Sequence, residues 1–411
     1  MAGMGVRGLL LLRIISLSFT LTFGAAAESF GDPGHQGVRA GTEGDRSEQD
    51  AVQWELAYKA DLMGKLSGEG RRGYALDNLD IKVSINGDRL AGLHDTTALL
   101  RLLSNHGGKP GLKFDRLPAG MDNIETPYNA NTSKIYEAWV ERGFADGAAS
   151  LRVGLYDINS EFYVTDASGV FLQPTFGIGT ELGTTGKNGP SIFPTTSAGV
   201  RARLQPGSGS FLQAAVLDGV PGDPHNPAGT HIKFEKGDGA LWVAEGGVNG
   251  DDGKLAGGIW RYTSRFADLL DRNADGAPAQ RLSRGLYLLS ELSLWRANEA
   301  SVRGFLRLGK NDGDTVQFDS SASGGLTFQG LLPGRPTDEF GIAFSRLRNS
   351  AKFRSANPGL STFELTLEAT YRLRATPWLA VQPDLQYLAK HASDPRQDHT
   401  WYGGMRFELS F

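Results

Sequence analysis

The chain contains no cysteine, so an exported protein of this sequence has no disulfide bonds, no thiolate chemistry and no cysteine-built metal site. Basic residues are not in excess either: 42 Lys and Arg stand against 46 Asp and Glu, which gives no indication of a nucleic-acid partner. Beyond the N-terminal segment, no apolar run is long enough for a membrane-spanning helix. A chain with these absences needs a large core or a closed, hydrogen-bonded sheet.

The N-terminal segment has the layout of a secretory signal peptide. Arg7 and Arg13 flank an apolar, Leu-rich stretch, and three alanines ending at Ala27 offer a cleavage site. We therefore expect residues 1–27 to be removed on export; an N-terminal membrane anchor is the alternative. Residues 28–51 are polar and rich in glycine, so we interpret them as a flexible periplasmic lead-in.

Glycine is abundant, with 55 residues, while charged residues make up an ordinary 21% of the chain. This composition is typical of a fold with many strands and turns. From Val52 to the C-terminus, apolar and polar residues alternate with period two, which predicts about sixteen strands with one polar face each. The predicted strands span about 52–62, 76–86, 96–104, 134–144, 149–157, 197–205, 210–218, 239–248, 255–263, 285–296, 300–309, 324–332, 338–348, 362–374, 378–388 and 400–411.

The last of these strands keeps its alternation to the final residue. Small or apolar residues occupy every second position of "HTWYGGMRFELSF": Trp401, Gly403, Met405, Phe407, Leu409 and Phe411. A strand with one apolar face and no frayed tail fits a position in lipid, where no sheet edge can stay unpaired. We expect this strand to pair with the first and to close a barrel.

The connections between the predicted strands alternate in length. The even-numbered ones are short, such as "PGSG" after Gln205, and the odd-numbered ones are longer, with the longest between Asp157 and Ser197. Short turns on one rim and long loops on the other are typical of outer-membrane barrels. The sequence thus predicts an all-β fold for 52–411: a closed, antiparallel transmembrane β-barrel of about sixteen strands, with short periplasmic turns and long extracellular loops, in the bacterial outer membrane.

Several longer stretches support a specific family. They are "YKADLMGKLSGEGRRGYALDNLDI", "LRLLSNHGG", "NIETP", "SLRVGLYDINSEFYVTDASGVFLQPTFGIG", "PSIFPTTSAGVRARLQP", "FLQAAVLDGVPGDP", "GLTFQGLLPGRPTDEFGIAFSRL" and "TPWLAVQPDLQYL". Together they resemble the OprB-type carbohydrate-selective porins, from about residue 54 to residue 411. The resemblance implies passive diffusion of monosaccharides and other small solutes across the outer membrane. Leu155 and Tyr156 depart from the family pattern, which expects a basic and then an apolar residue there.

Candidate pore-lining residues follow from the alternation and from the longest loop. Sugar hydroxyls bind guanidinium donors and carboxylate acceptors, and sugar C–H faces pack on aromatic rings. Residues 158–196 are too apolar for an exposed loop tip, so we expect them to fold into the barrel beside the "NIE" stretch. The candidates for the constriction are Arg101, Glu125, Trp139, Arg152, Glu161, Phe162, Arg201, Arg203, Trp242, Arg303 and Arg307. The alternatives are an ion-paired wall that only braces the barrel and a loop that touches a neighbouring subunit.

Other functions remain open at this stage. The main one is a nonselective diffusion porin for small hydrophilic solutes and ions. An enzyme needs a nucleophile and a base brought together, and we expect the strand to point Ser104 and His106 in different directions. A gated receptor needs a plug domain larger than residues 28–51. The sequence predicts no cofactor and no metal site, because "DRNADG" (271–276) is only half of a calcium loop and fits a turn better. Expected partners are small neutral sugars and membrane lipid; monomer and homotrimer stay open.

Overall fold

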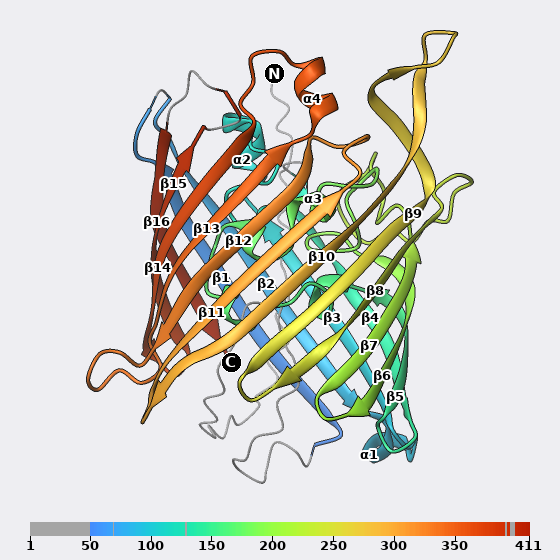
Figure 1. Cartoon of the computed structure of the whole chain (residues 1–411). Coiled ribbons are helices and arrows are strands. Elements are labelled where there is room, and N and C mark those ends of the chain that lie inside the picture. The colour runs from blue at the N-terminus through green and yellow to red at the C-terminus, as the bar shows by residue number, and fades with distance from the viewer. Residues whose placement is uncertain (1–49, 69, 128–129, 391–392, 395–398) are drawn as a thin grey trace, which may run out of the picture.

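The computed structural model describes residues 50–411 apart from 69, 128–129, 391–392 and 395–398. The predicted signal peptide and nearly all of the predicted lead-in lie outside the described residues. In the described part of the chain, sixteen antiparallel strands form one closed barrel (Figure 1). Each strand pairs with its neighbours in the sequence, and β1 pairs with β16. The predicted fold class is confirmed.

The strands are β1 (Val52–Lys65), β2 (Gly73–Asn86), β3 (Thr96–His106), β4 (Thr132–Phe144), β5 (Ala149–Tyr156), β6 (Ser197–Gly207), β7 (Ser210–Asp218), β8 (Ala240–Gly250), β9 (Gly253–Arg272), β10 (Pro278–Ala297), β11 (Ala300–Asn311), β12 (Phe318–Gln329), β13 (Glu339–Asn349), β14 (Phe363–Thr376), β15 (Leu379–Ala389) and β16 (His399–Ser410). Short helices lie in the connections: α1 (Gly87–Ala91), α2 (Pro110–Asp115), η3 (Ile158–Ser160), η4 (Asp166–Ser168), η5 (Pro174–Phe176), α3 (Thr180–Gly183) and α4 (Ala351–Ala356).

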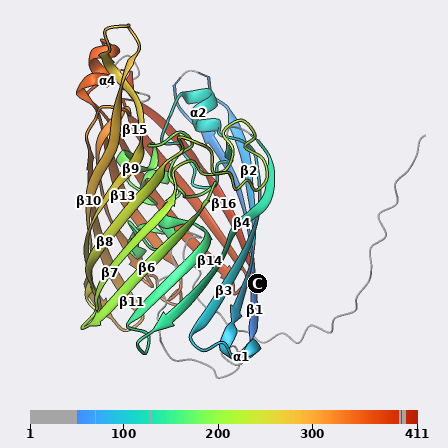
Figure 2. The same cartoon turned by 90° about the vertical axis from the view of Figure 1, so that its right-hand side faces the viewer.

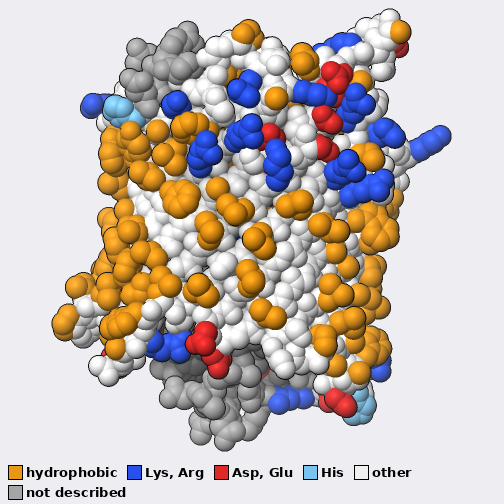
Figure 3. Space-filling view, viewed as in Figure 1, with side chains coloured by type: hydrophobic (Ala, Val, Ile, Leu, Met, Phe, Trp, Pro, Cys, Tyr) orange, Lys and Arg blue, Asp and Glu red, His pale blue; other side chains and the backbone are white. Residues whose placement is uncertain are grey.

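The two faces of the sheet differ in the way the alternation predicts. In β13, for example, Ile342 and Phe344 are exposed on the outer face, while Ala343 and Ser345 between them are buried. Hydrophobic side chains therefore spread over the outer wall, and lysines and arginines gather above them (Figure 3). None of the helices in the described residues is both long enough and apolar enough to cross a membrane.

The two rims of the barrel differ as predicted, with some exceptions. One rim carries tight turns such as 208–209 and 251–252, and the other carries the long connections 107–131 and 157–196 (Figure 2). Among the turns, 87–95 and 330–338 are longer than the rest. We call these two edges the turn rim and the loop rim. β1 starts and β16 ends at the turn rim, and the two strands pair antiparallel from Ala57 with Ser410 to Lys65 with Tyr402.

The largest difference from the predicted strands concerns β9 and β10. Each has 20 residues, whereas the alternation predicted about 255–263 and 285–296. The extra residues form a two-stranded ribbon beyond the wall, seen at the upper right of Figure 1. There Lys352 binds Asp268 at 2.5 Å and Asp271 at 2.8 Å, so polar pairs replace the apolar face that the prediction relied on. Within the "DRNADG" segment, Asp271 and Arg272 end β9 and residues 273–276 form the turn of this ribbon, as predicted.

The seam between β1 and β16 closes around a buried ion pair. Arg406 donates from Nε and from a terminal nitrogen to the two oxygens of Asp61, at 2.8 Å and 2.6 Å. Both side chains are buried, and the same guanidinium reaches Asn123 at 2.6 Å. One residue of the last strand thus joins the first strand and the β3–β4 connection.

This seam gives a stability prediction. Asp61→Ala removes the bidentate partner of a buried guanidinium and leaves Asp122, at 3.3 Å, as the remaining carboxylate, so we expect a loss of about 3 kcal/mol, the lower end for a broken buried pair. The measurement is the temperature at which the folded barrel converts to the unfolded form in heated-sample gel electrophoresis. The control is Glu55→Ala on the same strand, whose pair with Lys82 at 3.6 Å is partly exposed and contributes about 0–1 kcal/mol. Equal effects of the two substitutions would contradict the seam's role.

Candidate pore constriction

The β5–β6 connection, residues 157–196, lies inside the barrel and is held there by carboxylates of the wall. Glu245 of β8 accepts a hydrogen bond from the Tyr163 amide at 2.8 Å. Glu368 of β14 accepts from the amides of Leu172 and Gln173 at 2.6 Å and 3.0 Å. Because these strands lie on different sides of the barrel, the connection crosses the lumen. We call it the inner loop.

One guanidinium fixes the middle of the inner loop. Arg307 of β11 donates to the carbonyl oxygens of Gly177 at 2.7 Å and Tyr163 at 3.1 Å, and also to that of Phe176. Its guanidinium carbon lies 4.7 Å from the centre of the Tyr163 ring. Arg307 is 1% exposed, so it clamps backbone carbonyls rather than facing water.

Apolar side chains of the inner loop cover an apolar part of the inner wall. Phe162 is 1% exposed and belongs to a buried cluster with Leu241 and Val243 of β8 and Trp260 of β9. A second cluster joins the Phe171 and Phe176 rings of the loop to Phe305 of β11 and Ala343 of β13. Removal of this surface from water stabilises the loop's place inside the barrel.

The "NIE" stretch of the β3–β4 connection packs beside the inner loop. The Asn123 amide donates to the Leu172 carbonyl at 2.7 Å, and Asn105 of β3 donates to the Ile124 carbonyl at 2.8 Å. Glu125 accepts from the Gly111 amide at 2.9 Å and is 5% exposed. Burial raises the pKa of Glu125 to about 7. This carboxyl therefore holds its own connection together and offers little surface to a solute.

A cluster of arginines and glutamates forms where the start of the inner loop meets β4, β5 and β6. Arg152 and Arg201 are directly opposite each other on β5 and β6, an arrangement of like charges that needs anions nearby. Glu161 of the inner loop accepts two hydrogen bonds from Arg201, at 2.8 Å and 2.7 Å. Glu141 of β4 accepts from Arg152 at 2.8 Å and from Arg201 at 2.9 Å. The two carboxylates thus neutralise the opposed guanidinium groups.

Part of this cluster faces water. Arg201 is sealed, with its side chain 1% exposed, but the side chains of Arg152, Glu141 and Arg203 are 11%, 19% and 30% exposed. Although burial raises it, the pKa of Glu161 lies below its usual value because Arg152 and Arg201 stabilise the carboxylate. Charged donors and acceptors are therefore presented together at one place of the lumen.

Aromatic rings flank the cluster. The Arg152 guanidinium carbon lies 3.7 Å from the centre of the Trp139 ring and 5.0 Å from that of Tyr156. Tyr156 also donates its hydroxyl hydrogen to Glu161. Tyr156 thus places a phenol in the cluster, at a position where we expected an apolar residue from the sequence. This arrangement offers planar donors, acceptors and a ring surface, the groups that bind polyhydroxylated solutes.

Comparisons with known proteins agree with this architecture. The sequence profile described as "Carbohydrate-selective porin, OprB family" matches residues 71–411. The chain belongs to this family. The match begins after β1, later than the resemblance read from the sequence, which starts near residue 54.

Two curated relatives match most of this OprB-family chain. Porin B of Pseudomonas aeruginosa is 20% identical over 431 aligned positions, covering 94% of the chain and 93% of the relative. A putative porin of Acinetobacter baylyi named QuiX is 21% identical and covers 90% and 92%.

Solved structures show the same fold. The high-pH structure of Pseudomonas putida OprB superimposes with a TM-score of 0.77 at 17% identity, covering 89% of this chain and 95% of that chain. The trimer form of OmpT from Vibrio cholerae superimposes with a TM-score of 0.52 at 10% identity, covering 88% and 99%. Members of the OprB family are channels of the bacterial outer membrane, and the chain shares that location.

The predicted lining residues have different surroundings in this OprB-family barrel. Arg101 is 2% exposed and bound by Asp80 at 2.7 Å, so it lies within the wall. Arg303 pairs with Glu291 at 3.6 Å, and its side chain is 24% exposed towards the lumen. Arg152, Arg203 and Trp139 lie at the cluster described above. Phe162, Glu125, Arg201 and Arg307 are buried supports.

Trp242 was wrong as a pore-lining residue. It is 55% exposed on the outer face of β8, opposite Arg261 of β9. The reason is parity: Trp242 and the inward-facing Glu245 are three residues apart, so they lie on opposite faces of the strand. Trp242 instead takes a place typical of the aromatic girdle near a membrane surface.

The expectation about Ser104 and His106 also needs correction. Residues two apart in a strand share a face, so alternation does not separate these side chains. Their partners do: the Ser104 hydroxyl contacts that of Ser133 at 2.8 Å, and His106 Nδ1 contacts Asp77 at 2.7 Å. Among the described residues, no group of His, Asp and Glu is arranged to hold a metal ion.

Glu125 makes the stability of the β3–β4 connection depend on pH. Between pH 4.5 and about 7 the folded chain keeps a proton that the unfolded chain releases. The stabilisation that protonated Glu125 gives to the folded connection is therefore complete below pH 4.5. It is lost as the pH rises to about 7, and the free energy of unfolding falls by about 3 kcal/mol. Because intrinsic amide exchange also speeds up with pH, the measurement is the protection factor: for residues 110–125 it should fall over this range in the wild type and much less in Glu125→Gln.

The control for this prediction is Asp251→Asn, which removes an exposed carboxyl from the β8–β9 turn. It should leave the pH dependence of exchange unchanged. A profile for Glu125→Gln as steep as that of the wild type would show that another group is responsible.

Proposed function

We propose that this OprB-family channel passes small neutral sugars of the glucose type by passive diffusion, with selectivity set at the cluster of Arg152, Arg203, Glu141 and Trp139. The observation that carries the proposal is the joint presentation of guanidinium and carboxylate groups to lumen water beside an aromatic ring. Three arginines, including Arg201, stand against two glutamates, so the local charge nearly cancels. A site of this kind binds hydroxyl groups without strongly favouring either sign of ion.

The description of the family supports the same proposal. The family is described as carbohydrate-selective, and its sequence profile matches residues 71–411, which include the inner loop and all strands after β1. The charged groups of the cluster are paired with one another and hold the inner loop. In this cluster no nucleophile lies beside an available base, which argues against catalysis there. The contrasting function is a nonselective diffusion porin, in which the same cluster would only brace the wall.

Conductance of single channels in a planar bilayer tests the proposal. Glucose that binds in the pore should block ion flow in a concentration-dependent way. Arg203→Ala removes the most exposed guanidinium of the cluster and should weaken the block by about tenfold, the effect of losing one hydrogen bond to a charged group.

The matched control is Arg142→Ala, which removes an exposed arginine from the outer face of β4. It should leave the glucose block as in the wild type. If glucose fails to reduce the current while the channel still passes salt, the selective reading is wrong and the nonselective porin is correct.

A further inference from the structure

The outer wall carries a belt of basic side chains near the loop rim. Six exposed arginines and lysines project outward from four strands, with Arg261 and Arg265 on β9, Arg284 on β10, Lys310 on β11, and Arg346 and Arg348 on β13. Figure 3 shows the blue side chains gathered on this face directly above the hydrophobic wall. We call these residues the basic belt.

Two members of the belt face each other without a carboxylate between them. Arg261 and Arg284 are directly opposite across β9 and β10, and both are exposed. Among the described residues neither guanidinium forms an ion pair, and the nearby carboxylate is that of Asp312, which accepts from the Arg284 backbone amide at 3.2 Å. Like charges in this position destabilise a sheet. Trp242 lies opposite Arg261 on the other side, so an aromatic residue marks the membrane surface at the same level.

Two of the other basic side chains of the belt share a single carboxylate, that of Asp319. Lys310 and Arg348 align through Ser320 of β12, and both approach Asp319, at 3.0 Å and 4.0 Å. Their side chains are 52% and 45% exposed. Arg346 stacks at 4.6 Å from the centre of the Phe363 ring and has no carboxylate partner in the described structure. This part of the belt also has uncompensated positive charge.

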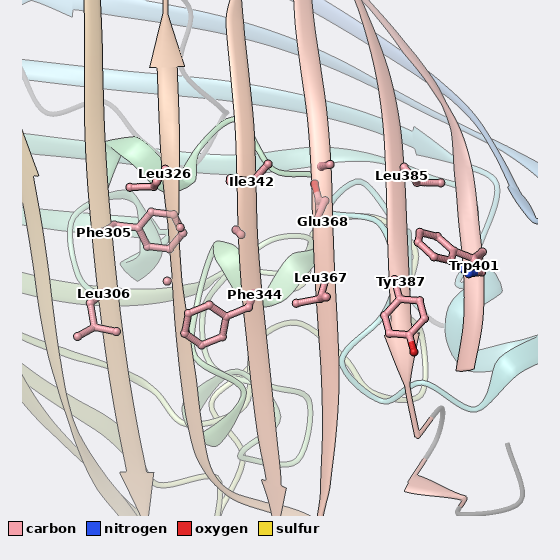
Figure 4. A pocket seen from close by; sticks show the side chains of 14 residues that line it. Phe305, Leu306, Leu326, Ile342, Phe344, Leu367, Glu368, Leu385, Tyr387 and Trp401 are labelled. Carbon is pink, nitrogen blue, oxygen red and sulfur yellow. The ribbon is translucent and has the colours of Figure 1, made fainter. Parts of the chain in front are cut away.

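A groove of about 840 Å³ lies on the outer wall on the turn-rim side of the belt. One row of its side chains runs across neighbouring strands in register, with Leu306, Gly324, Phe344, Leu367 and Tyr387. Figure 4 shows the large members of this row side by side. Gly324 has no side chain, and the Phe344 ring and Leu306 close over it: a Cβ there would lie 3.1 Å from the ring and 3.4 Å from Leu306. Arg346 is the next outward residue after Phe344 on β13.

We propose that this face binds a phosphorylated, multiply acylated lipid of the membrane leaflet on the loop side. The phosphates contact the basic belt, and acyl chains occupy the groove. Juxtamembrane basic residues attract anionic headgroups, and within the described part of the chain the two opposed arginines have only the nearby Asp312 carboxylate to offset their charge. Arg284 on β10 is three strand spacings, about 14 Å, from the β13 arginines, and Arg261 on β9 is four, about 19 Å. This separation suits a headgroup with two phosphates better than one.

Native mass spectrometry of the purified barrel in detergent tests the proposal with bisphosphorylated lipid A as the probe. The wild type should retain lipid A in preference to its monophosphorylated form and to phosphatidylglycerol. The double substitution Arg261→Gln with Arg284→Gln should weaken lipid A binding at least about tenfold, since each basic residue contributes about a factor of five.

The matched control is Arg142→Gln with Arg296→Gln, which removes two exposed arginines near the turn rim and should retain wild-type binding. Heat-modified migration on gels verifies that both variants are folded. Equal lipid retention by the two double variants, or equal affinity for lipid A and phosphatidylglycerol, would overturn the proposal. So would a belt variant that keeps its lipid but loses self-association, because a second copy of the chain would then occupy this face.

Discussion

Polar side chains of the inner wall bind the backbone of the inner loop, a segment with little regular structure of its own. Backbone amides and carbonyls removed from water need partners, and a loop of this kind cannot supply them all. Glu245, Glu368 and Arg307 supply them from three different strands. The backbone groups of the closed sheet bond to one another. The inward side chains are therefore available to hold the loop inside the barrel.

The charged cluster follows from this anchoring. Glu161 reaches the opposed Arg152 and Arg201 only because the inner loop starts immediately after β5 and turns into the lumen at η3. Without the loop, two guanidinium groups would face each other with only Glu141 nearby. The same side chains that secure the loop thus leave Arg203, Arg152 and Glu141 exposed to the lumen with their charges nearly balanced.

Alternation was enough to predict the barrel, its strand number and most inward-facing residues, because the side-chain period of a strand follows from its geometry. It failed for Trp242 through a parity error, and for the β9–β10 ribbon because ion pairs there replace the apolar face. The sequence could not tell which inward residues face the lumen, such as Arg203, and which are buried, such as Arg307. That difference depends on which part of the inner wall the inner loop covers. One signal was present: Leu241, Val243 and Trp260 make part of the inner wall apolar, so something had to cover it.

The central claim is that the inner loop crosses the lumen and limits the width of the channel. Its most direct test replaces residues 166–185 with a short Gly-Ser linker that joins the loop's ends, followed by single-channel conductance in a planar bilayer. The account predicts a folded barrel with a clearly higher conductance than the wild type, because the segment carrying η4, η5 and α3 no longer fills the lumen. A folded barrel with wild-type conductance would contradict it.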